Sequence, residues 1–207
     1  TYRFDRIDKI ALGTFEAPSF VTDDDLFHRD PATWQPLSTG TETLEFLLTI
    51  PREVPGEIEP PYRVLVYQHA MGVCKETILA LGDTLARFGI AVIGIDAMQH
   101  GSRNPAGPGS CEIAFTDFFA FENFAKTSAY FEQSVIDIWS LVRMLQEGGG
   151  IDVMPYPAGD GTSDLDTERL AFAGQSMGAS MGINAMALEP AFAAAVLNVG
   201  MGYLLDL

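Results

Sequence analysis

The stretch Leu170-Ala-Phe-Ala-Gly174-Gln175-Ser176-Met177-Gly178 decides the fold. Its first five residues are an apolar run of the kind that forms a buried strand, and the small and apolar residues after Ser176 predict a helix. The pattern Gly-x-Ser-x-Gly falls at the junction, where a sharp strand-to-helix turn lifts the serine hydroxyl above the sheet. Glycine is expected at 174 and 178 because side chains there would collide as strand and helix close up.

Strands and helices alternate along the rest of the chain. Strands are predicted for 41–50, 63–68, 90–95, 170–174 and 193–199, and helices for 75–88, 124–145 and 177–188. Most of these strands are apolar on both faces, which predicts an α/β fold with a mostly parallel sheet covered by helices on both faces. We expect an N-terminal extension of short strands and loops over 1–40 and a core domain over 41–207.

The composition bounds the size and the partners of the protein. The chain has 207 residues, of which 47% are hydrophobic, enough for one sizeable core. Twelve Lys and Arg against 28 Asp and Glu give a net charge of −16, which disfavours a nucleic-acid partner. No apolar run approaches the roughly 18 to 20 residues that cross a bilayer, so no transmembrane segment is expected.

The two cysteines, Cys74 and Cys111, do not have the spacing of metal ligands, so no zinc site is expected. They either form a disulfide or are buried thiols. The acidic composition and the scarcity of lysine favour an exported protein, periplasmic or extracellular, with one disulfide. The chain begins at Thr1 rather than at a methionine, so we expect a processed or trimmed product, in which an export signal would already be gone.

The serine of the junction is the candidate nucleophile. A serine hydroxyl attacks a carbonyl only when a base takes its proton and preorganised donors stabilise the oxyanion. The backbone N–H of Met177, at the start of the predicted helix, is one candidate donor. The second is expected from the loop after an earlier strand, where the N–H of Met71 is our first choice and that of Ala70 the alternative.

Three features together resemble the α/β-hydrolase superfamily over about residues 41–207. They are a strand ending in His69-x-x-Gly72, a strand ending in Asp96 with His100-Gly101 close behind, and the Gly174–Gly178 turn. The features are similar to those of bacterial esterases and lipases. The resemblance implies a Ser-His-Asp/Glu triad that hydrolyses esters, amides or related bonds without a cofactor or metal, on a small-molecule or lipid ester.

The histidines depart from the pattern of the superfamily, in which the acid and then the histidine follow the serine. His28, His69 and His100 all precede Ser176. His69 and His100 are expected to support the loops and the pocket, as is Asp96, which is expected to cap the turn after its strand. We therefore expect the catalytic histidine and acid to lie beyond residue 207; a base supplied by His100 is the alternative.

The leading hypothesis is a serine hydrolase that cleaves carboxylic esters through an acyl-enzyme on Ser176. The alternatives are a non-catalytic binding module with the same fold, and an acyltransferase or peptidase. Four phenylalanines before the longest predicted helix are candidates for lining an acyl pocket: Phe115, Phe118, Phe119 and Phe121.

Overall fold

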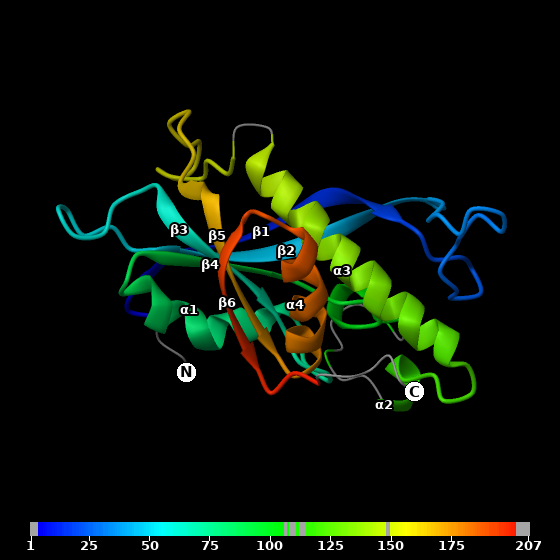
Figure 1. Cartoon of the computed structure of the whole chain (residues 1–207). Helices are drawn as coiled ribbons and strands as arrows, with labels where there is room; N and C mark the ends of the chain where they lie inside the picture. The colour runs from blue at the N-terminus through cyan, green and yellow to red at the C-terminus, as the bar shows by residue number, and fades with distance from the viewer. Residues whose placement is uncertain (1–3, 106, 108–110, 112–114, 148–149, 202–207) are drawn as a thin grey trace.

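The computed structural model describes residues 4–105, 107, 111, 115–147 and 150–201, with the side chains of 115 and 116 excepted (Figure 1). Six strands form one sheet in the order β1-β2-β4-β3-β5-β6. The strands are β1 (Ile7–Ser19), β2 (Gly40–Pro51), β3 (Tyr62–Gln68), β4 (Ile90–Ile95), β5 (Leu165–Gln175) and β6 (Phe192–Asn198). Neighbours from β4 to β6 are parallel, whereas β2 is antiparallel to both β1 and β4.

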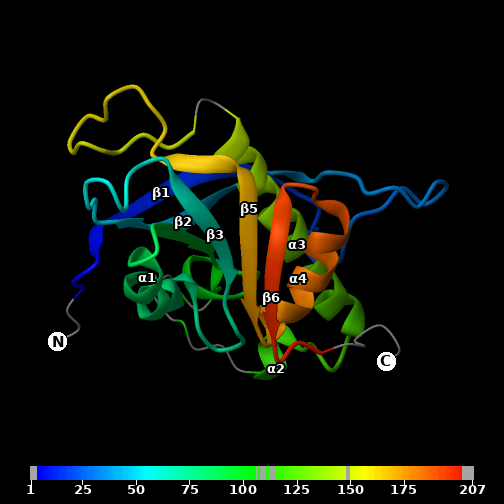
Figure 2. The same cartoon turned by 60° about the vertical axis from the view of Figure 1, so that its left-hand side comes forward.

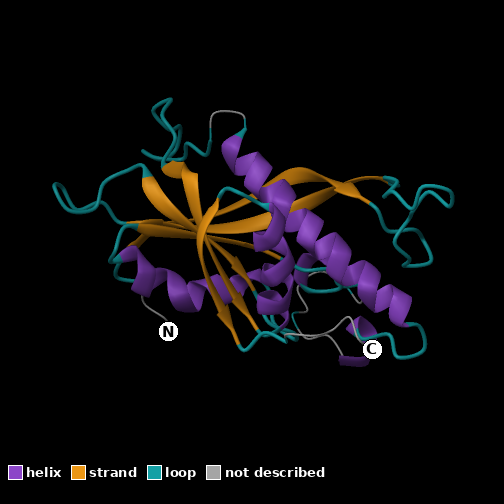
Figure 3. Ribbon diagram, in the orientation of Figure 1, coloured by secondary structure: helices purple, strands orange, loops and turns teal. Residues whose placement is uncertain are grey.

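Helices cover both faces of this sheet (Figures 2 and 3). They are α1 (Ile78–Ala86), α2 (Phe115–Phe118), α3 (Phe124–Gln146) and α4 (Met177–Leu188), with 3-10 turns η1 (Lys75–Thr77) and η2 (Gly101–Arg103). Helix α1 packs on one face, and α3 and α4 pack on the other. The predicted α/β architecture is thereby confirmed. None of the described helices is long and apolar enough to span a bilayer.

The two faces bury apolar cores of unequal size. The larger core, under α3 and α4, contains Ile93, Ile138 and Phe172, each with no exposed surface. The smaller one, under α1, is built around Ile78 and Val92. Each fully buried side chain of this kind contributes about 1.5–3 kcal/mol to the free energy of unfolding. The two cores fix the carboxyl ends of the parallel strands, where the loops of interest begin.

The N-terminal region differs from the short strands that were expected. Strand β1 has 13 residues and pairs with β2 from Ile7 to Ser19. Only the side chains of Ile7, Phe15 and Ala17 are buried, because β1 is an edge strand with one face towards the core. The regularity of β1 comes from β2, a partner distant in sequence. The predicted helix 75–88 also differs, since it begins as the 3-10 turn η1 and ends at Ala86.

Candidate active site

Ser176 occupies the turn between β5 and α4 with φ 52° and ψ −112°. A residue other than glycine in this region carries backbone strain of about 1–3 kcal/mol, which the surroundings must hold in place. The Ser176 N–H donates to the carbonyl of Asn198 at 2.9 Å, and the Asn198 side-chain amide donates to Gln175 at 2.6 Å. The end of β6 therefore anchors the strained turn. Ser176 itself is half-buried.

The two glycines of the turn allow close backbone packing. A Cβ on Gly174 would lie 2.4 Å from the carbonyl oxygen of Gly178. A Cβ on Gly178 would lie 2.2 Å from the carbonyl oxygen of Gln68 and 2.6 Å from that of His69. Helix α4 thus begins in direct contact with the end of β3. This contact brings the candidate nucleophile beside the loop that follows His69.

The candidate oxyanion donors lie in these two adjoining segments. Met177 is the first residue of α4, so its N–H has no acceptor within the helix. Ala70 and Met71 lie in the turn directly after β3, and Gly72 continues that turn with φ 74°. The close approach of Gly178 to the carbonyls of Gln68 and His69 brings together the two segments that carry these candidate donors.

His69 is fully buried and braces this loop. Its Nε2 accepts the backbone N–H of Ala97 at 3.0 Å, so the proton is on Nδ1, which donates to the carbonyl of Ala70 at 2.7 Å. Burial lowers the pKa of His69 to about 4, against the opposing effect of the Ala70 bond. The ring is therefore neutral at pH 7. Both of its nitrogens are engaged by the backbone.

His100 is a second buried brace between the same loops. Its Nδ1 donates to the carbonyl of Met98 at 2.8 Å, and its Nε2 faces the N–H of Gly72 at 3.4 Å. Burial lowers the pKa of His100 as well. The two histidine rings are 5.0 Å apart between centroids. Both histidines link the loop after β3 to the loop after β4, and neither presents a free nitrogen to Ser176.

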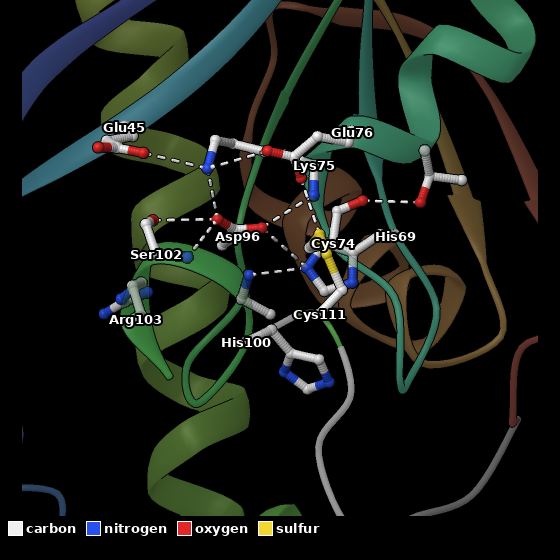
Figure 4. A network of polar contacts seen from close by, with 12 residues as sticks. Glu45, His69, Cys74, Lys75, Glu76, Asp96, His100, Ser102, Arg103 and Cys111 are labelled. Carbon is white, nitrogen blue, oxygen red and sulfur yellow. Dashed lines mark hydrogen bonds and ion pairs between the residues drawn. A yellow bond between two sulfur atoms is a disulfide. The ribbon is translucent and has the colours of Figure 1, made fainter. Parts of the chain in front are cut away.

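Asp96 is the centre of a buried polar network (Figure 4). One carboxylate oxygen accepts the backbone N–H of Lys75 at 2.8 Å. The other accepts the Lys75 ammonium at 2.8 Å and the backbone N–H and hydroxyl of Ser102 at 2.9 and 3.0 Å. Burial alone would raise the pKa of Asp96, but these partners lower it below its ordinary value. Asp96 therefore holds η1, the end of β4 and η2 together.

Lys75 is the residue of this site that the sequence did not indicate. Its side chain is 4% exposed, and its ammonium also lies 3.1 Å from Glu45 and 3.6 Å from Glu76. Burial alone would lower the pKa of Lys75, but Asp96 and the two glutamates raise it. The pattern placed Lys75 at the start of an amphipathic helix, where a lysine is usually solvated. Only the fold shows that it neutralises Asp96.

A disulfide joins Cys74 to Cys111, with the Cα atoms 5.2 Å apart. Cys74 directly precedes Lys75, so the covalent link lies beside the Asp96 network (Figure 4). The ligand-type atoms of Cys74, Cys111 and Glu76 lie within 4.8 Å of one another. The disulfide uses both sulfurs, so these three residues offer only one metal-ligand group.

Arg103 is a further buried charge that the sequence did not indicate. Its guanidinium forms two hydrogen bonds with Glu42, at 3.0 and 2.8 Å, and one with Asp137 at 2.6 Å. Burial alone would lower the pKa of Arg103, but the two carboxylates raise it. Arg103 thereby connects the loop after β4 to β2 and α3.

The phenylalanines proposed for an acyl pocket divide between core and surface. Phe118 has no exposed surface and packs against His100 and Tyr130, with ring centroids 5.4 and 5.7 Å apart. It is a core residue, so its assignment to a pocket wall was wrong. Phe119 is buried too, Phe121 is exposed, and the side chain of Phe115 lies outside the described residues.

Known structures share this architecture. The chain aligns with a Klebsiella pneumoniae protein described as a dienelactone hydrolase at a TM-score of 0.53 and with a ferulic acid esterase from Streptomyces cinnamoneus at 0.52. A peroxisomal α/β-hydrolase from Saccharomyces cerevisiae also aligns at 0.52. Each is 17% identical over 92–95% of this chain, and the chain covers 60%, 61% and 45% of their respective lengths.

These alignments establish the fold class. The chain has the α/β-hydrolase fold, and it spans about half to three-fifths of the length of these structures. No protein-family model matches the sequence, and no curated protein matches it. At this identity the likeness concerns the fold, so the chemistry has to be argued from the site itself.

Proposed function

We propose that the protein is a serine hydrolase that cleaves carboxylic esters and that Ser176 is its nucleophile. The observation that carries this proposal is the strained conformation of Ser176, held between Gly174 and Gly178 at the start of α4. Strained backbone conformations of this kind cluster at functional sites, where the surrounding structure maintains them. The strained backbone at Ser176 therefore supports a functional role for this serine.

The proposed reaction has two steps. Ser176 Oγ forms a bond to the acyl carbon while its proton passes to a base, and the N–H groups of Met177 and Met71 stabilise the oxyanion. The bond to the alcohol oxygen then breaks, and the alcohol leaves with a proton. Water hydrolyses the acyl-serine, which releases the carboxylic acid and restores the hydroxyl.

We further propose that the base and its acidic partner come from outside residues 1–207. The support is the engagement of His69 and His100, whose ring nitrogens are occupied by the backbone. His28 lies on the segment between β1 and β2, where its Nδ1 contacts the carbonyl of Leu37. The engagement of both ring nitrogens disfavours a base supplied by His69 or His100.

Hydrolysis of a neutral 4-nitrophenyl ester by the full-length protein tests the proposal. Ser176→Ala is expected to lower kcat by about a thousandfold or more, because the nucleophile is lost. Ser128→Ala, on the exposed side of α3, is the matched control and is expected to retain the wild-type rate. Equal rates for Ser176→Ala and wild type would overturn the assignment.

A non-catalytic binding module is the second candidate function. The burial and neutrality of His69 and His100 favour it, because neither ring is placed to take the proton of Ser176. A binding module would retain its ligand or partner in the Ser176→Ala variant and would hydrolyse no ester. An esterase would lose turnover in that variant while retaining its fold.

We also propose that the protein is exported to the periplasm or the extracellular space. The support is the Cys74–Cys111 disulfide, since such bonds persist in oxidising compartments and are rare in the cytosol.

A further inference from the structure

The cations of this chain are divided between the two ends of the sheet. We call the carboxyl ends of the parallel strands, where Ser176 lies, the site end. Seven described basic residues lie at the opposite end, beside the starts of β1, β3 and β5, after the end of the antiparallel strand β2, or at the ends of α1 and α3: Arg6, Lys9, Arg52, Arg63, Arg87, Arg143 and Arg169. The bond from Gln146 at the end of α3 to the Thr167 carbonyl in the first part of β5 confirms that this helix returns to that end.

The four remaining described cations lie in or contact the loops and the first half of α3 towards the site end, and all four are paired. Lys75 is held by Asp96, and Arg103 by Glu42 and Asp137. Arg29 pairs with Glu132, and Lys126 pairs with Asp25 at 3.2 Å. Within the described residues, no unpaired lysine or arginine therefore faces a ligand at the site end.

Carboxylates are in excess at the same end. Asp117 on α2 and Glu122 just before α3 are exposed, and Glu76 is half-exposed directly after the candidate oxyanion loop. The net charge of −16 on residues 1–207 adds a negative potential over this chain. Exposed carboxylates at the site end would repel an anionic substrate. The described lysines and arginines at this end would not offset the repulsion, because each is already paired with a carboxylate. A neutral or cationic substrate would meet no such barrier.

We infer that the active site takes esters that are uncharged or carry a positive charge, and that it discriminates against esters bearing a carboxylate or phosphate. This inference rests on the proposed function of Ser176 and names the substrate class of the same site. It concerns the part of the site that this chain builds. Charge repulsion acts on anionic esters in the encounter and binding steps, so the discrimination against them appears in kcat/KM. It weakens with salt, because salt screens the charges.

Three 4-nitrophenyl esters of similar length test the inference on the full-length protein: the butyrate, the hemisuccinate and the 4-(trimethylammonio)butyrate. The spontaneous hydrolysis of each ester, which for the hemisuccinate includes intramolecular attack by its carboxylate, is measured without protein and subtracted. At low ionic strength we expect kcat/KM for the hemisuccinate to be about tenfold or more below that for the butyrate. We expect 0.5 M salt to narrow this difference, because charges are then screened over a few ångströms.

The outcomes separate the two levels of the proposal. Hydrolysis of the butyrate with an equal or higher rate for the hemisuccinate overturns the substrate class and leaves the function of Ser176 standing. Hydrolysis of none of the three esters overturns the proposed function, and the substrate class falls with it. A kcat/KM for the 4-(trimethylammonio)butyrate below that for the hemisuccinate also contradicts the inference.

Two charge reversals distinguish local charge from net charge. Glu122→Lys and Glu57→Lys change the net charge equally, but Glu57 lies in the loop after β2, at the opposite end of the sheet. We expect Glu122→Lys to raise the relative rate of the hemisuccinate about two- to threefold at low salt. Glu57→Lys is expected to have a smaller effect. Equal effects of the two variants would contradict a site-end origin of the discrimination.

Discussion

Two neighbouring parts of the site are built in different ways. One is the turn at Ser176, and the other is the pair of loops after β3 and β4, which we call the paired loops because buried polar contacts join them. The turn is specified by consecutive residues, since Gly174 and Gly178 permit the close packing that strains Ser176. The paired loops depend on buried polar contacts between distant residues, such as Lys75 with Asp96. A motif can therefore locate a candidate nucleophile, whereas its supporting structure becomes visible only in the fold.

Loss of the Lys75 ammonium should be the most damaging change to the paired loops. Lys75→Met leaves the Asp96 carboxylate buried without its counter-ion, which costs about 3–5 kcal/mol in the free energy of unfolding. Urea denaturation followed by circular dichroism measures this loss. Lys126→Met is the matched control: its pair with Asp25 is partly exposed, and its removal should cost less than about 1 kcal/mol.

The double variant Lys75→Met/Asp96→Asn sharpens this test. The isolated charge is then absent, so the loss should be smaller than the sum of the two single losses. Strict additivity, or a Lys75→Met variant no less stable than Lys126→Met, would contradict the role of the pair.

Removal of the disulfide should cause the next largest loss in the free energy of unfolding. Cys74 and Cys111 are 37 residues apart, and closing such a loop stabilises the folded state by about 3–4 kcal/mol in the chain-entropy model. Cys74→Ser/Cys111→Ser is expected to lose this amount in urea denaturation. A reducing agent should destabilise the wild type similarly and leave the double variant unchanged. A reductant effect on the double variant would show that the loss has another cause.

A methyl group at Gly178 tests the local construction of the turn. Gly178→Ala places a Cβ against the carbonyl of Gln68, and we expect a loss of about 3 kcal/mol in the free energy of unfolding. Thermal denaturation measures this loss. Asn184→Ala, at an exposed position of the same helix, is the control and should be neutral. A Gly178→Ala variant as stable as the control would show that the turn has room to adjust.

Protonation of His69 should give the smallest of these changes in the free energy of unfolding near neutral pH. Its pKa is about 4 in the folded protein and about 6.5 when unfolded, so its contribution is complete above pH 6.5. As pH falls from 6.5 towards 4, the unfolded state binds the extra proton and stability is lost, by up to about 1.4 kcal/mol per pH unit. Urea midpoints measured between pH 7 and 4.5 follow this loss.

A variant without the titrating ring isolates this contribution. His69→Gln retains an acceptor for the Ala97 N–H, so its stability should fall less steeply over the same pH range. Identical slopes for His69→Gln and the wild type would exclude His69 as the source of the acid sensitivity.

The sequence predicted those elements whose pattern is local. Strand β4 and helix α4 have the predicted bounds, because each is a continuous run with a clear stop. The length of β1 was missed because it depends on pairing with β2. Burial of Lys75 was missed because its partners, Asp96 and Glu45, are 21 and 30 positions away, and no local pattern reports such a contact.

The cysteines illustrate the same limit. Their spacing left a disulfide and two buried thiols as alternatives, and the composition favoured the disulfide. The structure confirms the disulfide, because the fold brings together the loops that carry Cys74 and Cys111. The roles of Ser176, Met177 and Met71 stay predictions.

Covalent labelling of the full-length protein with a fluorophosphonate is the most direct test of the central claim that Ser176 is an activated nucleophile. The probe reacts with serines whose hydroxyl is activated, and peptide mass spectrometry identifies the modified residue. We predict a single adduct on Ser176, abolished in Ser176→Ala and retained in Ser128→Ala. An adduct on another residue, or none on the folded protein, would contradict the claim.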